Sequence, residues 1–280
     1  LRTWFGNNEK ERDMRDIRDD LFRSIYGRRF RAALTAERAG VLAGTEAAKA
    51  QADELGIELE LCKADGEELM HGERIGTLVA AAKQVALAEE RMIGALAKAS
   101  GIATAARTAV LMADGRAEIV SGSWKKMPPQ IKELVRGAIL TGGANCRIAE
   151  QPMIYLDKNY IRMLGSIPQA LAACASFHEY TKVVQLRGES ATVAWETQAA
   201  VRGGADILMV DTGAREDLEC CLSELAAMGC RGHIKVAFAG NVKLTDIPEL
   251  SERADILCIG KEIVDAPLLD WKLDVMREEC

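Results

Sequence analysis

Two lysines, an asparagine and an arginine lie at the ends of one helical pattern and could together bind an anion. Lys125 and Lys126 precede a Pro-Pro step, and the run 128–147 then contains a helical pattern that ends in a Gly-Gly turn. Asn145 and Arg147 follow that turn, just before an apolar strand-like run. Taken alone, such residues are commonly solvated surface lysines and a helix C-cap. Their chemistry therefore depends on what the rest of the chain places beside them.

Composition limits the kinds of protein that this chain can be. It has 280 residues, 49% hydrophobic and 28% charged, with a formal net charge of -6. That length suits one α/β barrel, or a barrel with a smaller companion domain. A net negative charge argues against a nucleic-acid partner, so an anion site must be a local concentration of Lys and Arg. Lys83 and Arg107 interrupt the longest apolar segments, so we expect no membrane span.

The cysteines and histidines indicate a reducing compartment and no zinc site. Eight cysteines include no C-x-x-C pair, and several lie inside apolar runs. This pattern favours free thiols in the cytoplasm over a disulfide framework. Only three histidines are present, and none has metal-ligand spacing to another.

Short apolar runs alternate with helical segments in the second half of the chain. This rhythm predicts βα units, a parallel sheet, and a full or incomplete α/β barrel. The six strand-like runs are 117–121, 153–156, 182–186, 206–210, 233–238 and 255–259. The first half instead has an alternating strand at 57–62 followed by glycine turns, which is typical of a small α/β sandwich. We therefore expect a sandwich domain at 1–105, completed by the tail 262–280, and a barrel domain at 106–261.

Polar residues and glycines follow the predicted barrel strands. In such barrels the chemistry lies at the carboxyl ends of the strands. These ends carry the following residues: Asp157 with Lys158, Arg187, Asp211, Ala239-Gly240-Asn241, and Gly260-Lys261. Glycines leave backbone N–H groups open to a phosphate, so Ala239, Gly240, Asn241 and Gly260 are candidate phosphate-binding residues. The alternative is that these glycines only close tight turns.

Taken together, these features resemble the quinolinate phosphoribosyltransferase family, from about Asp16 almost to the end of the chain. The motifs that carry the resemblance are Glu90-Arg91 with S-G-I-A-T at 100–104, the spacing of 128–147, I-L-M-V-D ending at Asp211, and A-P-L-L-D at 266–270. The resemblance implies an N-terminal α/β sandwich domain and an incomplete, open α/β barrel.

The resemblance also implies an activity. Members of the family transfer ribose 5-phosphate from phosphoribosyl pyrophosphate to a pyridine dicarboxylate, with loss of pyrophosphate and carbon dioxide. Mg²⁺ is the implied cofactor. The implied assembly is a homodimer or a hexamer of dimers, with each active site at a subunit interface.

Several residues of this chain match functional positions of the family. Arg91 corresponds to an arginine that reaches the barrel of the neighbouring subunit in the dimer, and Arg147 corresponds to an arginine that binds substrate. Lys125 and Asp211 correspond to catalytic residues, with Asp211 near the ribose and the metal. Trp124, Asn145 and Lys158 are further candidate substrate-binding residues. Trp124 offers a flat surface, Asn145 follows the Gly-Gly turn together with Arg147, and Lys158 could partly compensate for lost positive charge.

Other family positions are replaced. Trp124 stands where the family has an arginine, Cys146 where it has a histidine, and Asp157 where it has a lysine, while Gln185 or Arg187 lies near an expected glutamate. These changes remove about three positive charges, and one charge contact is worth about 4 kcal/mol at 4 Å and an effective dielectric of about 20. We therefore expect an acceptor less anionic than quinolinate, with Trp124 as a stacking surface.

Three functions remain open from the sequence. The first is an active pentosyltransferase of this family. The second is a repurposed barrel that binds another ligand or has lost phosphoribosyl transfer. The third is thiol chemistry at Cys146, because a neighbouring arginine lowers the pKa of a thiol.

Overall fold

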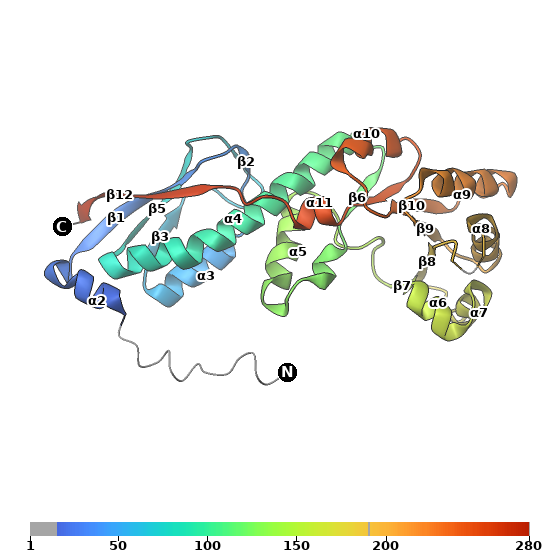
Figure 1. Cartoon of the computed structure of the whole chain (residues 1–280), viewed down its shortest axis with the longest axis horizontal. Helices are drawn as coiled ribbons and strands as arrows, with labels where there is room; N and C mark the ends of the chain where they lie inside the picture. The colour runs from blue at the N-terminus through green and yellow to red at the C-terminus, as the bar shows by residue number, and fades with distance from the viewer. Residues whose placement is uncertain (1–15, 190, 280) are drawn as a thin grey trace.

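Two sheets joined by one long helix organise the chain, and the computed structural model describes residues 16–189 and 191–279. An antiparallel sheet of four strands lies at one end of the long axis, and a parallel sheet of six strands lies at the other (Figure 1). The helix α4 (Ala82–Ala113) extends from the first sheet to the second. The molecule is therefore elongated, with one domain around each sheet.

The N-terminal sheet takes one of its edge strands from the other end of the chain. Its strands lie in the order β12 (Trp271–Glu279), β1 (Arg29–Ala36), β5 (Arg74–Ala81) and β3 (Glu58–Leu61). Helices α3 (Thr45–Leu55) and α4 pack on this sheet through a core that includes Leu34, Leu78 and Met92. A small ribbon of β2 (Gly40–Val41) and β4 (Glu68–Leu69) completes the domain.

The S-G-I-A-T motif lies inside α4, where two other segments of the chain cross the helix. Ser100 Oγ accepts a hydrogen bond from the Ala43 amide at 3.0 Å, and Thr104 Oγ1 accepts one from the Val41 amide at 2.9 Å. A Cβ atom at Gly101 would lie 2.1 Å from the carbonyl oxygen of Pro267. The small residues of the motif therefore allow close backbone approach. The expected domain boundary after residue 105 falls inside this continuous helix.

The parallel sheet is open, as expected for an incomplete barrel. Its strands lie in the order β6 (Glu118–Val120), β11 (Ile256–Cys258), β10 (Lys235–Ala239), β9 (Ile207–Asp211), β8 (Thr181–Leu186) and β7 (Met153–Leu156). Across the described residues no pairing joins β6 to β7, so the sheet has two free edges. Each of the six strand-like runs predicted from the sequence overlaps one of these strands.

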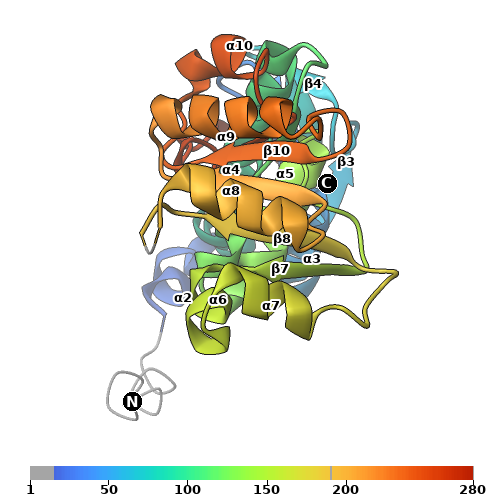
Figure 2. The ribbon, with the colours of Figure 1, turned by 90° about the vertical axis from the view of Figure 1, so that its right-hand side faces the viewer.

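Helices cover one face of this sheet, and the other face forms the interior of the open barrel. The covering helices include α6 (Lys158–Leu164), α7 (Ile167–Ala173), α8 (Val193–Arg202) and α9 (Arg215–Ala227) (Figure 2). Side chains alternate between the two faces, as successive residues of a strand must. On β9, Leu208 packs in the core under the helices, whereas Ile207 and Met209 belong to the interior cluster. The same alternation places Asp211 on the interior side, where β9 ends.

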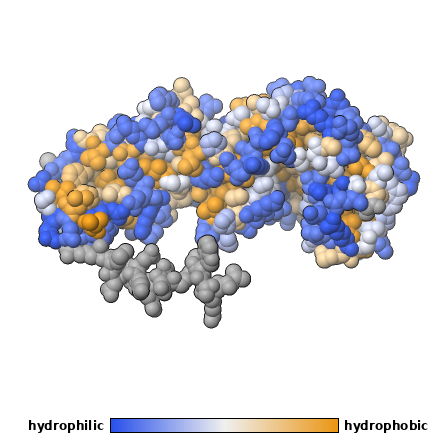
Figure 3. Space-filling model, in the orientation of Figure 1, coloured by the Kyte–Doolittle hydropathy of each residue, from blue (hydrophilic) through white to orange (hydrophobic). Residues whose placement is uncertain are grey.

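The remaining elements are short, except for α5 (Lys132–Thr141). They are α2 (Ile17–Leu21), η1 (Arg23–Ile25), η2 (Ser123–Lys126), η3 (Pro129–Ile131), η4 (Leu244–Asp246), α10 (Ile247–Leu250) and α11 (Lys261–Val264). Ile17 and Leu21 on α2 are largely exposed. Hydrophilic residues cover most of the face shown in Figure 3, with hydrophobic patches between them. In the part of the chain that the structure describes, no helix has both the length and the hydropathy to cross a membrane.

Candidate active site

A cavity of about 640 Å³ lies at the carboxyl ends of the barrel strands. Seven of the residues predicted from the sequence line it, and they come from four different strand ends and the loop before β7. These are Lys125, Arg147, Asp211, Ala239, Gly240, Asn241 and Gly260. The parallel sheet brings them together because all of its strands end at the same edge.

The cavity has an excess of positive charge. Its lining includes four cationic side chains and two carboxylates: Lys125, Lys126, Arg147, Lys261, Asp211 and Asp265. Among the described residues none of the four cations forms an ion pair, whereas many other arginines and lysines of the chain do. Lys125 Nζ lies 6.0 Å from the ring centres of both Trp124 and Tyr155. These cations are therefore available for an anionic ligand.

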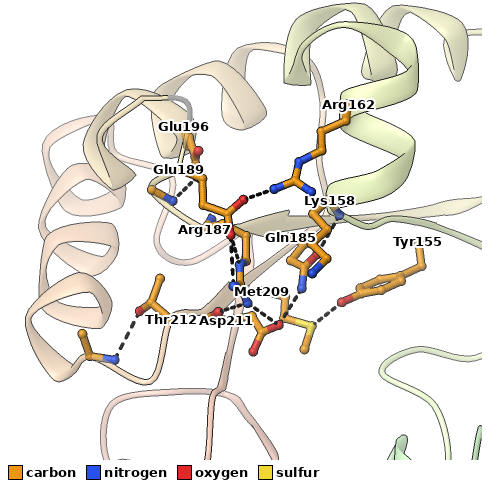
Figure 4. Close-up of polar contacts among 12 residues, drawn as sticks. Tyr155, Lys158, Arg162, Gln185, Arg187, Glu189, Glu196, Met209, Asp211 and Thr212 are labelled. Carbon is orange, nitrogen blue, oxygen red and sulfur yellow. Dashed lines mark hydrogen bonds and ion pairs between the residues drawn. The ribbon is translucent and has the colours of Figure 1, made fainter. Parts of the chain in front are cut away.

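Asp211 is held in place by two donors (Figure 4). Gln185 Nε2 donates to Asp211 Oδ2 at 2.6 Å, and Arg187 Nη1 donates to the same oxygen at 3.3 Å and to the Asp211 carbonyl at 2.8 Å. In the described part of the chain, Asp211 Oδ1 accepts no hydrogen bond. One carboxylate oxygen is thus fixed by the protein, and the other is left for a ligand.

Gln185 also links Asp211 to the helix after β7. Its Oε1 accepts a hydrogen bond from the Lys158 amide at 2.7 Å, so both ends of the buried side-chain amide are bonded. Gln185 lies near the position where the family resemblance led us to expect a glutamate. An amide can donate to Asp211, whereas an ionised glutamate could only accept.

Arg187 lies between two carboxylates and contributes no free charge to the cavity. Besides Asp211, it contacts Glu189 at 3.1 Å, and Glu189 also pairs with Arg162 (Figure 4). These neighbouring carboxylates raise the pKa of Arg187 against the opposing effect of burial, and Arg187 and Arg162 hold the pKa of Glu189 below its usual value. Buried Glu196 accepts hydrogen bonds from the Arg187 amide at 2.8 Å and the Gly188 amide at 3.0 Å. The loop that carries Arg187 is therefore fixed.

Asp157 acts as a helix cap and does not line the cavity. Its side chain accepts hydrogen bonds from the amides of Asn159 at 2.8 Å and Tyr160 at 3.0 Å, which makes it the N-cap of α6. The sequence predicted that Asp157 adds a negative charge to the site, but its carboxylate caps α6 and lies outside the cavity lining. Lys158 is the first residue of α6, is exposed, and is also absent from the cavity lining.

Trp124, Asn145 and Arg91 also lie outside the cavity lining. The Trp124 indole N–H donates to the Cys146 carbonyl at 3.0 Å, and Arg136 lies 5.5 Å from the ring centre. Trp124 thus supports the loop that carries Arg147, and it is not a stacking surface within this cavity. Asn145 forms a backbone bridge to Val120. Arg91 is on α4 in the N-terminal domain, 3.7 Å from Glu54.

The glycine loops after β9 and β10 pack backbone against backbone. Gly240 has a φ of +108°, and a Cβ atom there would lie 2.3 Å from the Gly213 amide nitrogen. The Gly213 amide donates to the Ala239 carbonyl at 3.0 Å. Gly240 is therefore required by its own backbone and by its neighbour, whatever the loop binds. Asn241 also has a positive φ, of +62°, and both residues line the cavity.

Sequence reasoning missed the apolar interior of the cavity. Met153 and Tyr155 on β7, Met209 on β9, and Cys258 at the end of β11 line it. The Tyr155 hydroxyl donates to Met209 Sδ at 2.9 Å. Burial raises the pKa of the Tyr155 hydroxyl, and burial followed by the charge of Asp211 raises the pKa of the Cys258 thiol to about 12. Strand parity was the signal that could have found them, since all four share a face with Asp211.

The geometry argues against thiol chemistry at Cys146. The side chain is buried, and its Sγ donates to the Arg136 carbonyl at 3.4 Å. Burial raises the pKa of this thiol, and Arg136 and Arg147 offset that effect only in part. The arginines do lower the pKa of this thiol, as the sequence suggested, but burial outweighs them, so the net shift disfavours a thiolate.

The described residues contain no cluster of three or more His, Cys, Asp or Glu side chains suited to hold a metal ion. One free carboxylate oxygen on Asp211 nevertheless fits the mode that Mg²⁺ prefers in phosphate sites. In that mode the protein supplies one or two carboxylates, and the substrate phosphates and water supply the other ligands.

Comparisons with known proteins agree with an enzyme of two domains built around an open α/β barrel. The family model for the quinolinate phosphoribosyl transferase C-terminal domain matches residues 102–274, and the model for the N-terminal domain matches residues 17–100. The chain therefore belongs to the quinolinate phosphoribosyl transferase family.

Individual relatives and solved structures share less than a third of their residues with this chain. A protein from Methanothermobacter thermautotrophicus, named as a probable carboxylating nicotinate-nucleotide pyrophosphorylase, is 29% identical over 89% of this chain and 89% of its own length. The human carboxylating nicotinate-nucleotide pyrophosphorylase is 27% identical over 89% of this chain and 83% of its own. The structure of the nicotinate-nucleotide pyrophosphorylase from Pyrococcus furiosus superposes with a TM-score of 0.79 at 21% identity, covering 100% of this chain and 79% of that one. This last likeness supports the fold.

Proposed function

We propose that this chain is a pentosyltransferase that moves ribose 5-phosphate from phosphoribosyl pyrophosphate to a ring nitrogen of a heterocycle, as a pyridine nucleotide is built. Its family supports this proposal, as do relatives named nicotinate-nucleotide pyrophosphorylase that align with most of its length. No observation in the described residues favours a repurposed barrel.

The observation that carries the proposal is the group of four unpaired cations beside one tethered carboxylate at the strand ends. Loss of pyrophosphate builds negative charge on the leaving oxygen and positive charge on the ribose. Cations at the cavity stabilise the first change, and the tethered carboxylate of Asp211 stabilises the second. Lys125 and Arg147 would bind the anionic groups, and Asp211 would lie beside the ribose.

Ala239, Gly240, Asn241 and Gly260, at the ends of β10 and β11, line the same cavity, and their backbone amides would bind the 5-phosphate. The elements that follow them, η4, α10 and α11, are at most four residues long. A helix dipole is therefore a minor contribution to phosphate binding here.

Mg²⁺ is part of the proposal as a companion of the pyrophosphate group. Asp211 Oδ1 would hold the ion together with substrate phosphates. When bound, the ion neutralises part of the charge on the leaving pyrophosphate.

A homodimer, or a hexamer of dimers, is also proposed. Arg91 lies on α4, outside the cavity of its own chain, so it would reach a cavity only in a second subunit. The exposed side chains of Ile17 and Leu21 on α2 give the same domain an apolar surface for contact. A cytoplasmic location belongs to the same proposal, supported by free cysteines at 62, 146, 174, 220, 221, 230 and 258.

Release of pyrophosphate tests the proposed function. The chain is mixed with phosphoribosyl pyrophosphate, Mg²⁺ and each of several pyridine carboxylates, and pyrophosphate is measured with time. We expect release that depends on both enzyme and acceptor, and a loss of at least about 100-fold in Lys125→Ala. Lys132→Ala, an exchange on α5 outside the cavity lining, is the matched control. Release that is equal in wild type and Lys125→Ala would refute the proposal.

A further inference from the structure

The charges of the cavity are enough for one phosphorylated sugar but leave little for a dianionic acceptor. Four cations and two carboxylates line the cavity, an excess of about two positive charges. A phosphate monoester alone carries about two negative charges near neutral pH, and the pyrophosphate group carries more. Phosphoribosyl pyrophosphate therefore requires all of the free cations, even with Mg²⁺ bound.

The other cationic side chains near the cavity either form ion pairs within the chain or lie outside the cavity lining. Arg187 is shared between Asp211 and Glu189. Lys158 is on α6 outside the lining, and Arg136 lies over the Trp124 ring. The partner subunit's Arg91, which we propose to reach this cavity, adds one free cation, which can pair with one carboxylate of an acceptor but not with two.

The interior wall of the cavity is instead apolar and rich in sulfur. We call Met153, Tyr155, Met209 and Cys258 the sulfur floor; all four belong to the interior cluster of the open sheet. The Tyr155 hydroxyl is satisfied by Met209 Sδ, so it does not require a polar group from a ligand. Sulfur atoms and an aromatic ring make favourable contacts with a planar aromatic ligand.

We infer that the acceptor is a planar nitrogen heterocycle with at most one carboxylate, and that its ring lies against the sulfur floor. This inference rests on the proposed phosphoribosyl transfer and adds the class of acceptor. Its ring nitrogen uses a lone pair to form the bond to C1′ of the ribose. The bond between C1′ and oxygen breaks, and its electron pair leaves with pyrophosphate.

The acceptor class decides whether carbon dioxide is formed. Quinolinate has a carboxylate beside the ring nitrogen; that group leaves as carbon dioxide, and the electron pair left on the ring carbon takes up a proton. A heterocycle without a carboxylate at that carbon gives its ribonucleotide and pyrophosphate alone. The two classes are therefore separated by a second product as well as by rate.

A series of three pyridines tests the inference on the full-length chain. Quinolinate, nicotinate and nicotinamide carry two, one and no carboxylates on the same ring, and each is supplied with phosphoribosyl pyrophosphate and Mg²⁺. We expect kcat/KM for nicotinate or nicotinamide to exceed that for quinolinate by at least about 10-fold, a difference of about 1.4 kcal/mol, with no carbon dioxide. Preference for quinolinate with equal yields of carbon dioxide and pyrophosphate would overturn the inference and leave the proposed function intact.

Two further outcomes would overturn either the inference about the acceptor or the proposed function. Calorimetry with phosphoribosyl pyrophosphate and Mg²⁺ is run beside it. Binding without turnover of nicotinate or nicotinamide would overturn the inference. Absence of binding would overturn the proposed function, and this inference with it.

An exchange on the sulfur floor tests where the ring lies. Met209→Gln keeps the length of the side chain and an acceptor for the Tyr155 hydroxyl, but it places an amide against the ring. We expect KM of the best acceptor to rise at least about 10-fold while the Kd of phosphoribosyl pyrophosphate stays within about 2-fold. Met163→Gln, an exposed methionine on α6, is the matched control. An unchanged KM in folded Met209→Gln, with folding checked by its unfolding midpoint, would contradict the placement.

Discussion

At the scale of single residues, the site depends on which polar atoms are already bonded within the chain. Asp211 has one carboxylate oxygen tied to Gln185 and Arg187, and Gln185 is bonded at both ends of its amide. The spacing and the family resemblance predicted Asp211, Lys125 and Arg147 as site residues, and all three line the cavity. Sequence reasoning placed Trp124 and Lys158 in the site as well, since residue type alone does not say which partner a side chain meets. It missed Tyr155 and Met209, because they show no reactive group in the sequence and only the strand alternation relates them to Asp211.

Gln185→Glu tests the tether on Asp211. The exchange places a second carboxylate within 2.6 Å of Asp211 Oδ2. Two ionised carboxylates repel at that distance, whereas at lower pH one shared proton restores a hydrogen bond. We expect the variant to lose more thermal stability at pH 8 than at pH 5, by several degrees, in calorimetric melting. Gln130→Glu, at an exposed position, controls for the added charge. Equal losses at both pH values would contradict the tether.

At the scale of elements, the carboxyl ends of the parallel strands decide what reaches the cavity. The six strands were predictable because each is a short apolar run between helical segments, and their common direction follows from the βα rhythm. The role of Asp157 was not predictable in this way. It stands at a strand end on the interior side, yet it turns to bond the first amides of α6. The carboxylate of Asp157 therefore caps α6 and does not take part in the site.

Asp157→Ala is expected to lower stability and spare the transferase activity. Loss of the cap leaves two amides of α6 without their carboxylate, at a cost of about 1 kcal/mol. Urea unfolding measures the change, and pyrophosphate release should stay within about 2-fold of wild type. Asp157→Asn keeps a capping oxygen and should recover most of the stability. A large loss of activity in stably folded Asp157→Ala would place Asp157 in the site after all.

Gly240→Ala separates backbone strain from close packing. Gly240 combines a positive φ with a Cβ position 2.3 Å from the Gly213 amide nitrogen, whereas Gly204 has a φ of +81° and open space around it. We expect Gly204→Ala to cost about 1–2 kcal/mol from the left-handed conformation alone. Gly240→Ala should cost clearly more in urea unfolding and should weaken binding of phosphoribosyl pyrophosphate. Equal costs would contradict the close approach of the two loops.

At the scale of the whole molecule, the two domains are tied together twice. Helix α4 runs through both, and β12 returns from the barrel domain to pair with β1 along the N-terminal sheet. The sequence supported an N-terminal sandwich completed by the tail, but it did not show the order of the strands. Pairing between residues some 240 positions apart depends on tertiary structure, which local patterns do not encode. The elongated arrangement also keeps Arg91 away from the cavity of its own chain.

Mixing two inactive variants tests whether Arg91 serves a second subunit. In a shared-site dimer, Arg91→Ala and Arg147→Ala each damage every site when present alone. A mixed dimer regains one complete site, because one subunit supplies Arg147 and the other supplies Arg91. Random exchange of subunits should then restore about a quarter of wild-type activity. No recovery after exchange, with mixed dimers verified by mass, would show that Arg91 does not act across an interface.

Calorimetric titration with phosphoribosyl pyrophosphate and Mg²⁺ measures whether the unpaired cations of the cavity bind a phosphorylated sugar. We expect saturable binding at one site per chain, weakened at least about 100-fold when Lys125 and Arg147 are both replaced by alanine. Lys132→Ala should bind as wild type does. Binding that is absent in the wild-type chain, or equally strong in the double variant, would show that these cations do not hold a phosphorylated sugar.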